Sequence, residues 1–210
     1  MFNAAVQSVD TSIPGGGTLR VLTTAAADVR VYAKLPDGRA ASAAAYVRDN
    51  GTIAVYLLGT GTSPRAIAAG ELTLANLTAT DVTGELSWAM AAQTSGLHRA
   101  GVDTVLRVNG CIYTPGASLA MNGPATMEIS GGNLPSAISG ATTMTAGKVT
   151  IAPPIKRWIT SSASGTFTFM LSHPTRGNMP GSGVYLPKTN SVSGFLRDTT
   201  VGGRIEVTQP

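Results

Sequence analysis

Two histidines are the only side chains in this 210-residue sequence whose ordinary pKa would let them act as bases near neutral pH. His98 lies in the stretch GLHRAG and His173 in LSHPTRG, and both stretches read as loops. A nucleophilic serine partner would need an element such as the G-x-S-x-G elbow to present it, and GNMPGSG does not match that pattern. The sequence therefore predicts two loop histidines without a catalytic role, and no catalytic residues.

Metal-binding patterns are also missing from the sequence. Zinc sites are usually marked by paired ligands, whereas Cys111, His98 and His173 lie far apart. Residues 81–85, DVTGE, lack the density and spacing of acidic ligands found in calcium loops. We expect neither a metal site nor a cofactor site.

Carboxylates and glycine-rich loops offer two further kinds of chemistry. A glycoside hydrolase needs a pair of carboxylates, and Asp81, Glu85 and Glu128 fall near expected strands, where solvated positions explain them equally well. The stretches GGGTLR and GTGTSPRAIAAG match neither the phosphate-loop pattern nor the dinucleotide-binding pattern. The sequence favours turns between strands, and we expect the chain not to be an enzyme. A β-fold hydrolase would need activity that is lost with one acid or one histidine.

Aromatic residues could instead bind sugars. Trp88, Trp158 and the five tyrosines could line such a surface, and residues 155–160, IKRWIT, place a tryptophan beside two cations. Aromatic residues make up only 5% of the chain, so most of them are expected in the core. A glycan-binding surface remains an alternative.

Short β-prone runs separated by Gly, Pro and Asn are the elements that would position all of these residues. Residues 45–58, AYVRDNGTIAVYLL, predict a hairpin whose Asn50-Gly51 pair supplies the positive φ angles of a tight turn. The other strand candidates are residues 18–24, 28–35, 70–79, 103–114, 125–130, 148–152, 165–171, 182–186, 191–197 and 203–208. Many short strands with frequent turn signals predict an all-β chain, built as an antiparallel β-sandwich or as barrel-like domains.

Helical signals are short. Residues 63–70 could form one or two helical turns, and residues 84–96 could form a strand that runs into a short helix.

The expected domain organisation has three parts. Residues 1–17, which end in Pro-Gly-Gly-Gly, look like an extended N-terminal arm. A first β-rich domain would cover residues 18–95 and a second would cover 96–210; the alternative is one continuous β-sandwich over 18–210. No internal repeat is detectable in the sequence.

Charge and cysteine content narrow the partners and the compartment. Only 12% of the residues are charged, and the net charge of +4 is spread along the chain without a basic cluster, which argues against nucleic-acid binding. Cys111 is the only cysteine, so no intrachain disulfide can form. The N-terminus lacks a signal-peptide pattern and the longest apolar run, residues 53–58, is too short to cross a bilayer. We expect synthesis in the cytoplasm and no membrane partner.

Three segments resemble the structural proteins of tailed-bacteriophage particles, such as capsid decoration, capsid fibre and tail proteins. They are MFNAAVQSVDTSIPGGG, DVRVYAKLPDGRAASAAAYVRDNGTIAVYLL and GFLRDTTVGGRIEVTQP. Their composition is rich in Ala, Thr and Ser and poor in charged residues.

The resemblance implies a virion protein, made in the host cytoplasm without a signal peptide, that works by packing of subunits. Its partners would be copies of itself and other virion proteins, such as a major capsid or tail protein. Arg20, Arg30 and Arg48 would be contacts at the rim of such interfaces. The alternative function is a glycan-binding adhesin or receptor-binding protein.

Overall fold

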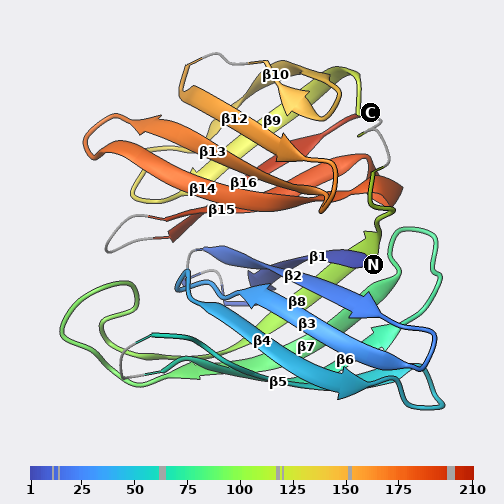
Figure 1. Ribbon diagram of the computed structural model, residues 1–210. Coiled ribbons are helices and arrows are strands. Elements are labelled where there is room, and N and C mark those ends of the chain that lie inside the picture. Colours follow the sequence, from blue (N-terminus) through green and yellow to red (C-terminus); the bar gives the residue numbers. More distant parts are fainter. Residues whose placement is uncertain are drawn as a thin grey trace.

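The chain is an all-β protein. The computed structural model describes all residues except 11, 14, 62–64, 117, 118, 120, 151, 152 and 198–201. The described residues form two eight-stranded sheets, in which all paired strands are antiparallel. Each sheet curls into a nearly closed barrel, and the two barrels are stacked (Figure 1). This confirms the predicted fold class.

The first barrel is an up-and-down meander over residues 2–112. Its strands are β1 (Phe2–Ser8), β2 (Gly16–Thr23), β3 (Asp28–Lys34), β4 (Ala40–Tyr46), β5 (Thr52–Leu58), β6 (Ile67–Leu74), β7 (Val82–Met90) and β8 (Val102–Ile112). Strand β1 pairs with β8 and joins the two ends of the meander. Strands β4 and β5 are the two edges of the sheet, and they lie side by side.

The second barrel repeats this winding over residues 123–208. Its strands are β9 (Gly123–Gly131), β10 (Ile138–Thr145), β11 (Lys148–Val149), β12 (Ile155–Ser161), β13 (Thr166–His173), β14 (Gly177–Leu186), β15 (Ser191–Arg197) and β16 (Gly202–Thr208), with a 3-10 turn η1 (Pro187–Thr189) between β14 and β15. Pairing of β9 with β16 joins its ends, and β11 and β12 are its edges.

The predicted turn at residues 49–51 forms, but not with the expected geometry. Gly51 has a φ of 77°, whereas Asn50 is not in the left-handed region. The Arg48 and Thr52 backbones are joined by a 2.9 Å hydrogen bond, and Gly51 N donates to Arg48 O. This is a three-residue loop with glycine at its left-handed position. Beyond this loop, β4 and β5 are not paired in the sheet. The predicted hairpin therefore separates into the two edge strands of the first barrel, and we call the line between them the seam.

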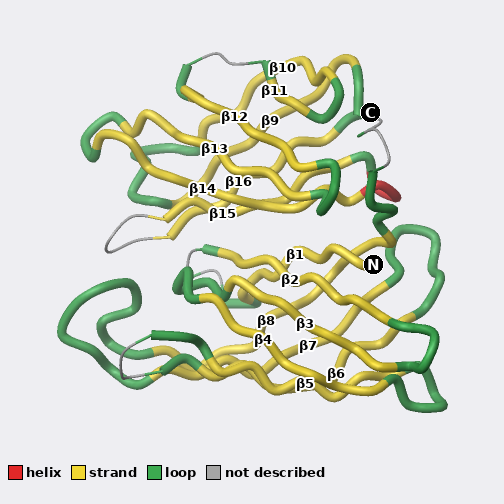
Figure 2. The backbone as a smooth tube through the Cα atoms, in the orientation of Figure 1, coloured by secondary structure: helices red, strands yellow, loops and turns green. Residues whose placement is uncertain are grey.

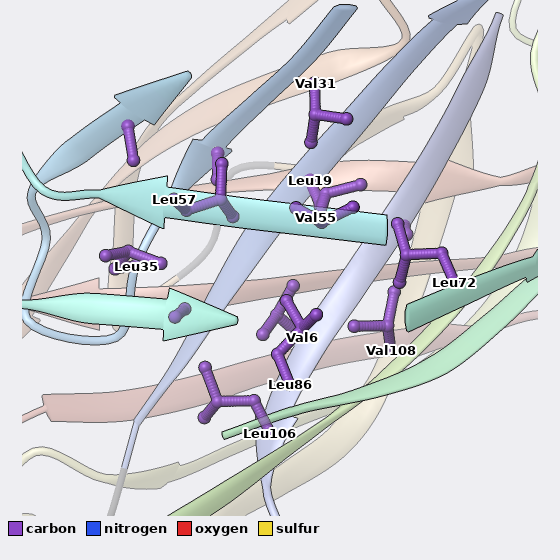
Figure 3. Packing of buried hydrophobic residues seen from close by; sticks show 14 of the residues in the cluster. Val6, Leu19, Val31, Leu35, Val55, Leu57, Leu72, Leu86, Leu106 and Val108 are labelled. Atoms are coloured by element: carbon purple, nitrogen blue, oxygen red, sulfur yellow. The ribbon is translucent and has the colours of Figure 1, made fainter. Parts of the chain in front are cut away.

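Aliphatic side chains fill the interior of the first barrel. Alternate residues of the strands point inward, as expected for antiparallel sheets with one buried face. Leu19, Val31, Val55, Leu86 and Leu106 come from five different strands and meet in this core (Figure 3).

Aromatic rings fill much of the second barrel. Trp158 stacks on Phe167 with ring centroids 4.3 Å apart, and Phe169 and Tyr185 surround the pair. The Trp158 indole N–H lies within hydrogen-bond distance of Gly147 O, at 3.2 Å.

The junction between the barrels is formed by β1, β2 and β8 of the first barrel, which contact β14, β15, β16 and η1 of the second (Figure 2). One face of β1 turns Ala4 and Val6 into the first core. The other face carries Asn3, whose side-chain amide donates to Ser164 O and Gly165 O of the second barrel, and Ala5, which packs in the cluster that includes Leu186. The strand is therefore buried on both faces.

Two parts of the expected domain organisation need correction. Residues 2–8 of the expected arm are strand β1, which occupies a central position between β2 and β8 and is therefore not an extended arm. The expected boundary between residues 95 and 96 falls inside the first sheet, since β7 and β8 pair across it. The change from one sheet to the other occurs between Ile112 and Gly123.

The helical alternatives are also corrected where the structure describes them. The strand expected at the start of residues 84–96 forms as part of β7 (Val82–Met90), whereas residues 91–96 are not helical. Residues 67–70 of the other expected helix belong to strand β6 (Ile67–Leu74). Residues 63 and 64, where the first of these helices would begin, lie outside the described residues.

Candidate interaction surfaces

A basic groove runs along the junction of the two barrels. It has a volume of about 310 Å³, and its cations are Lys34 from β3, Arg157 from β12 and Arg197 from the end of β15. The floor is the outer face of β12–β15, and the wall is the end of β3 with Gly38 of the turn after it. We call this surface the basic groove.

The register of the second sheet places the two arginines of the basic groove in one row. Arg157 is opposite Met170, and Met170 is opposite Pro180. Leu196 is opposite Gly181, so Arg197 lies at the level of Pro180. The row spans three strand spacings, which separates the two arginine backbones by about 14 Å.

The cations of the basic groove have few partners within the protein. Lys34 Nζ lies 3.5 Å from Ser182 Oγ, and Arg197 Nη1 donates to Gly38 O at 3.2 Å. Among the described residues, no carboxylate oxygen forms an ion pair with Lys34, Arg157 or Arg197. The charge of the groove is therefore available to a ligand.

A second hollow of about 640 Å³ continues the groove past Pro180 and Arg197 and adds Arg99 to its lining. Asp37 borders it, but its carboxylate is buried and is bound by Arg39, whose Nε lies 3.2 Å from Asp37 Oδ2. Burial raises the pKa of Asp37, although the Arg39 backbone N–H and guanidinium oppose this shift. The Asp37 carboxylate is therefore paired with Arg39 and does not offset the positive charge of the hollow.

His98 supports the same end of the first barrel. Its ring meets Trp88 edge-on with centroids 5.1 Å apart, and its Nε2 is buried. Burial lowers the pKa of His98, while the charge of Asp37 acts in the opposite direction. The His98 ring packs against Trp88 and does not line the hollow.

A second surface covers the outer face of β3–β6. Three tyrosines stand out from it: Tyr32, Tyr46 and Tyr56 are 46%, 71% and 58% exposed. Tyr32 is opposite Ser42 and Tyr56 is opposite Ala69. We call this surface the tyrosine face; it comprises Tyr32, Ala40, Ser42, Ala44, Tyr46, Ala54, Tyr56 and Ile67.

Charges lie at the edges of the tyrosine face and balance one another. Asp28 and Arg30 are exposed on β3. At the opposite edge Arg48 Nη1 lies 2.6 Å from Glu71 Oε2. Two of the predicted rim arginines, Arg30 and Arg48, thus border this face.

The third predicted rim residue, Arg20, is half-buried. Its guanidinium lies 3.1 Å from Met1 Sδ, so it is turned toward the protein itself.

The two tryptophans do not form a sugar-binding surface. Trp88 is completely buried in the first core, and Trp158 is 5% exposed in the second. Both tryptophans are thus core residues, as expected from the low aromatic content of the chain. Sugar stacking on either ring is therefore excluded by their burial.

The remaining candidates are scattered over the fold. His173 is buried at the end of β13, and its Nδ1 accepts hydrogen bonds from the backbone N–H groups of Thr175 and Arg176. Cys111 is buried at the barrel junction, and burial raises its pKa. Glu128 is exposed on β9.

The other two acids form ion pairs. Exposed Glu85 is 3.6 Å from Arg107, whereas Asp81 is buried and lies 2.6 Å from Lys188 of the second barrel. The structure thus does not bring Asp81, Glu85 and Glu128 together on one strand or in one hollow.

The basic groove could not be found from the sequence, because its two arginines, Arg157 and Arg197, are 40 residues apart and form no local cluster.

Comparisons with known proteins add no relative, since no family model and no curated protein matches the chain. Within the described part of the chain, no group of three His, Cys, Asp or Glu residues is placed to hold a metal ion. None of the described helices is long and apolar enough to span a membrane.

Proposed function

We propose that this chain is a structural subunit of an assembled particle, of the kind found in tailed bacteriophages, and that it acts by packing against another copy of itself through the tyrosine face. The observation that carries the proposal is the set of three exposed tyrosines on one low-charge sheet surface. Tyrosine is enriched at protein interfaces, because it adds a large apolar area at a small cost in conformational entropy.

The alternation of large and small side chains on the tyrosine face favours self-association. Hydrogen bonds join Arg48 to Thr52 and Thr60 to Ala40, so residues on β4 and β5 whose numbers sum to 100 face each other across the seam. Ala44 therefore faces Tyr56, and Ala54 faces Tyr46. Each large ring has a small neighbour, and a copy related by a two-fold axis would place its rings over those small positions.

The charges also suit a second copy. The charges of Asp28, Arg30, Arg48 and Glu71 sum to zero, and Lys34, opposite Ala40, adds a single positive charge, so repulsion between two such faces is small. A symmetric arrangement would let the acid of one copy approach an arginine of the other. Further virion proteins, such as a capsid or tail protein, would then contact other faces of the assembly.

The first test concerns self-association in solution. The double variant Tyr46→Asp/Tyr56→Asp places two charges in the tyrosine face, and we expect the oligomer of the natural chain to dissociate. Light scattering after size-exclusion chromatography measures the mass. Thr126→Asp/Thr143→Asp is the matched control, because it adds two charges to exposed strand positions of the second barrel. A natural chain that stays monomeric at high concentration contradicts the proposal.

The second test concerns the particle. Mass spectrometry of particles purified from the source should find this chain at a fixed ratio to the major structural protein. Its absence from such particles would remove the virion assignment even if the chain self-associates.

A further inference from the structure

We propose that the basic groove binds an acidic polysaccharide, whose carboxylate or sulfate groups pair with Arg157 and Arg197 at its two ends. This inference goes beyond the packing role and uses a different surface. The groove lies mainly on β12–β15, whereas the tyrosine face lies on the outer side of β3–β6; the two surfaces meet at Lys34, which is opposite Ala40.

The charge of the groove favours an anionic ligand. Lys34, Arg157 and Arg197 converge on the groove from both barrels, and no described carboxylate pairs with them. A concave surface lined by one sign of charge concentrates ligands of the opposite sign. Guanidinium groups bind carboxylate and sulfate-like oxyanions through paired N–H donors. The groove therefore selects an anion.

The spacing of the two arginines favours an extended ligand. The two arginine backbones lie about 14 Å apart on a regular sheet. An extended ligand with repeated negative groups can pair with the two guanidinium groups separately and fill the floor between them, which a single small anion cannot do. Lys34 reaches into the groove between them from the first barrel, near Ser182.

The floor between the two arginines suits a sugar chain. Met170 and Pro180 supply apolar contacts suited to the C–H faces of sugar rings, and Thr168 and Ser182 supply hydroxyl groups. Both phenylalanines of the lining, Phe169 and Phe195, are buried, so the described lining offers no exposed aromatic ring for stacking of nucleobases.

A peptide is less favoured than a sugar for a backbone reason. Strands β13 and β14 form most of the floor, and each is already paired on both sides. They therefore offer no free edge to which an extended peptide could add.

The groove is also held in shape before any ligand arrives. Arg197 lies against Gly38, where a β-carbon would overlap its guanidinium, and it donates to Gly38 O at 3.2 Å. This contact fixes one end of the row across the barrel junction. A preformed cation site loses less conformational entropy on binding.

The experiment measures binding of polygalacturonate and of heparin to the full chain by isothermal titration calorimetry, with neutral dextran as a blank. We expect at least one of the two acidic polysaccharides to bind and dextran not to bind. Removing both arginines, in Arg157→Gln/Arg197→Gln, should weaken binding roughly ten-fold or more, because two charge-assisted contacts are lost.

The matched control is Arg65→Gln/Arg107→Gln, which removes the same charge from exposed positions outside both the groove and the tyrosine face. Its affinity should stay within a factor of about two, because distant surface charges are screened by salt. Lys34→Glu provides a second groove variant if the double arginine variant does not fold.

Three results would overturn the proposal. The first is that neither acidic polysaccharide binds. The second is that the groove variants bind as well as the natural chain. The third is that polyglutamate or a single-stranded oligothymidylate binds more tightly than both polysaccharides and competes for the groove, which would assign it to a peptide or a nucleic acid.

Discussion

Glycines in β14 and β15 decide how the aromatic rings of the second barrel pack. The Phe167 ring lies over Gly183 and Gly194, and the Phe169 ring lies over Gly181. Each of these strand positions lacks a side chain on the inner face, and the ring of the neighbouring strand takes the space. Strand glycine usually weakens a sheet, but here the close approach of a ring requires it.

Gly183→Ala should therefore destabilise the protein by about 1–3 kcal/mol, because its new methyl group would overlap the Phe167 ring in a packed core. Thermal or chemical unfolding measures the change. Gly140→Ala on β10 is the control, since no atom lies within 4 Å of the position of its β-carbon, and we expect it to unfold like the natural chain. Equal stability of the two variants would contradict the assigned packing.

At the scale of the element, β1 shows how a polar-looking segment becomes a central strand. FNAAVQS has small and amide side chains and reads as weakly β-prone. The usual alternation of apolar and polar residues is not visible, because both faces of β1 make contacts. Asn3 and Gln7 bind the second barrel, and Gln7 donates to Glu206 at 2.9 Å. Ala4 and Val6 enter the first core. A strand that is buried on both faces does not show the usual apolar–polar period.

Deletion of residues 1–8 should therefore unfold the first barrel instead of releasing a folded core. It removes the partner of both β2 and β8 and opens the closure of the meander. Circular dichroism and two-dimensional NMR of the truncated chain report the loss. Deletion of residues 209–210, which follow the last strand, is the control. A truncated chain with unchanged unfolding would show that β1 is dispensable.

At the scale of the whole molecule, an ion pair between Lys188, which keeps some exposure, and the buried Asp81 helps to join the barrels. Lys188 on η1 reaches the loop before β7, where its Nζ lies 2.6 Å from Asp81 Oδ1, 2.6 Å from Asn76 Oδ1 and 2.7 Å from Leu77 O. Three acceptors satisfy the three donors of the ammonium group. Asp81 also accepts the backbone N–H of Ile112, so the contact braces the last strand of the first barrel.

Lys188→Met should cost about 3 kcal/mol of stability, because it leaves the Asp81 carboxylate buried without its cation. Each barrel holds one of the two tryptophans, so single-tryptophan variants follow each barrel separately during denaturation. We expect the two transitions to separate in Lys188→Met. Adding Asp81→Asn removes the buried charge and should restore part of the lost stability. No recovery in the double variant would show that the charge is not the cause.

The sequence by itself determined the fold class, the turn at residues 49–51 and the burial of most aromatic residues. These follow from local periodicity, turn chemistry and composition, which act over a few residues. The strand at residues 2–8 was missed, because these residues were expected to form an arm, and the division between the sheets was misplaced. Both depend on what covers each face of a strand.

Only the tertiary structure decided the two interaction surfaces. Arg157 and Arg197 share a row because four strands are aligned in register, and Lys34 joins them because the barrels stack. Tyr46 and Tyr56 share a face because the seam between β4 and β5 brings their strands together. Register and stacking arise from long-range pairing, and no local pattern of residues encodes them.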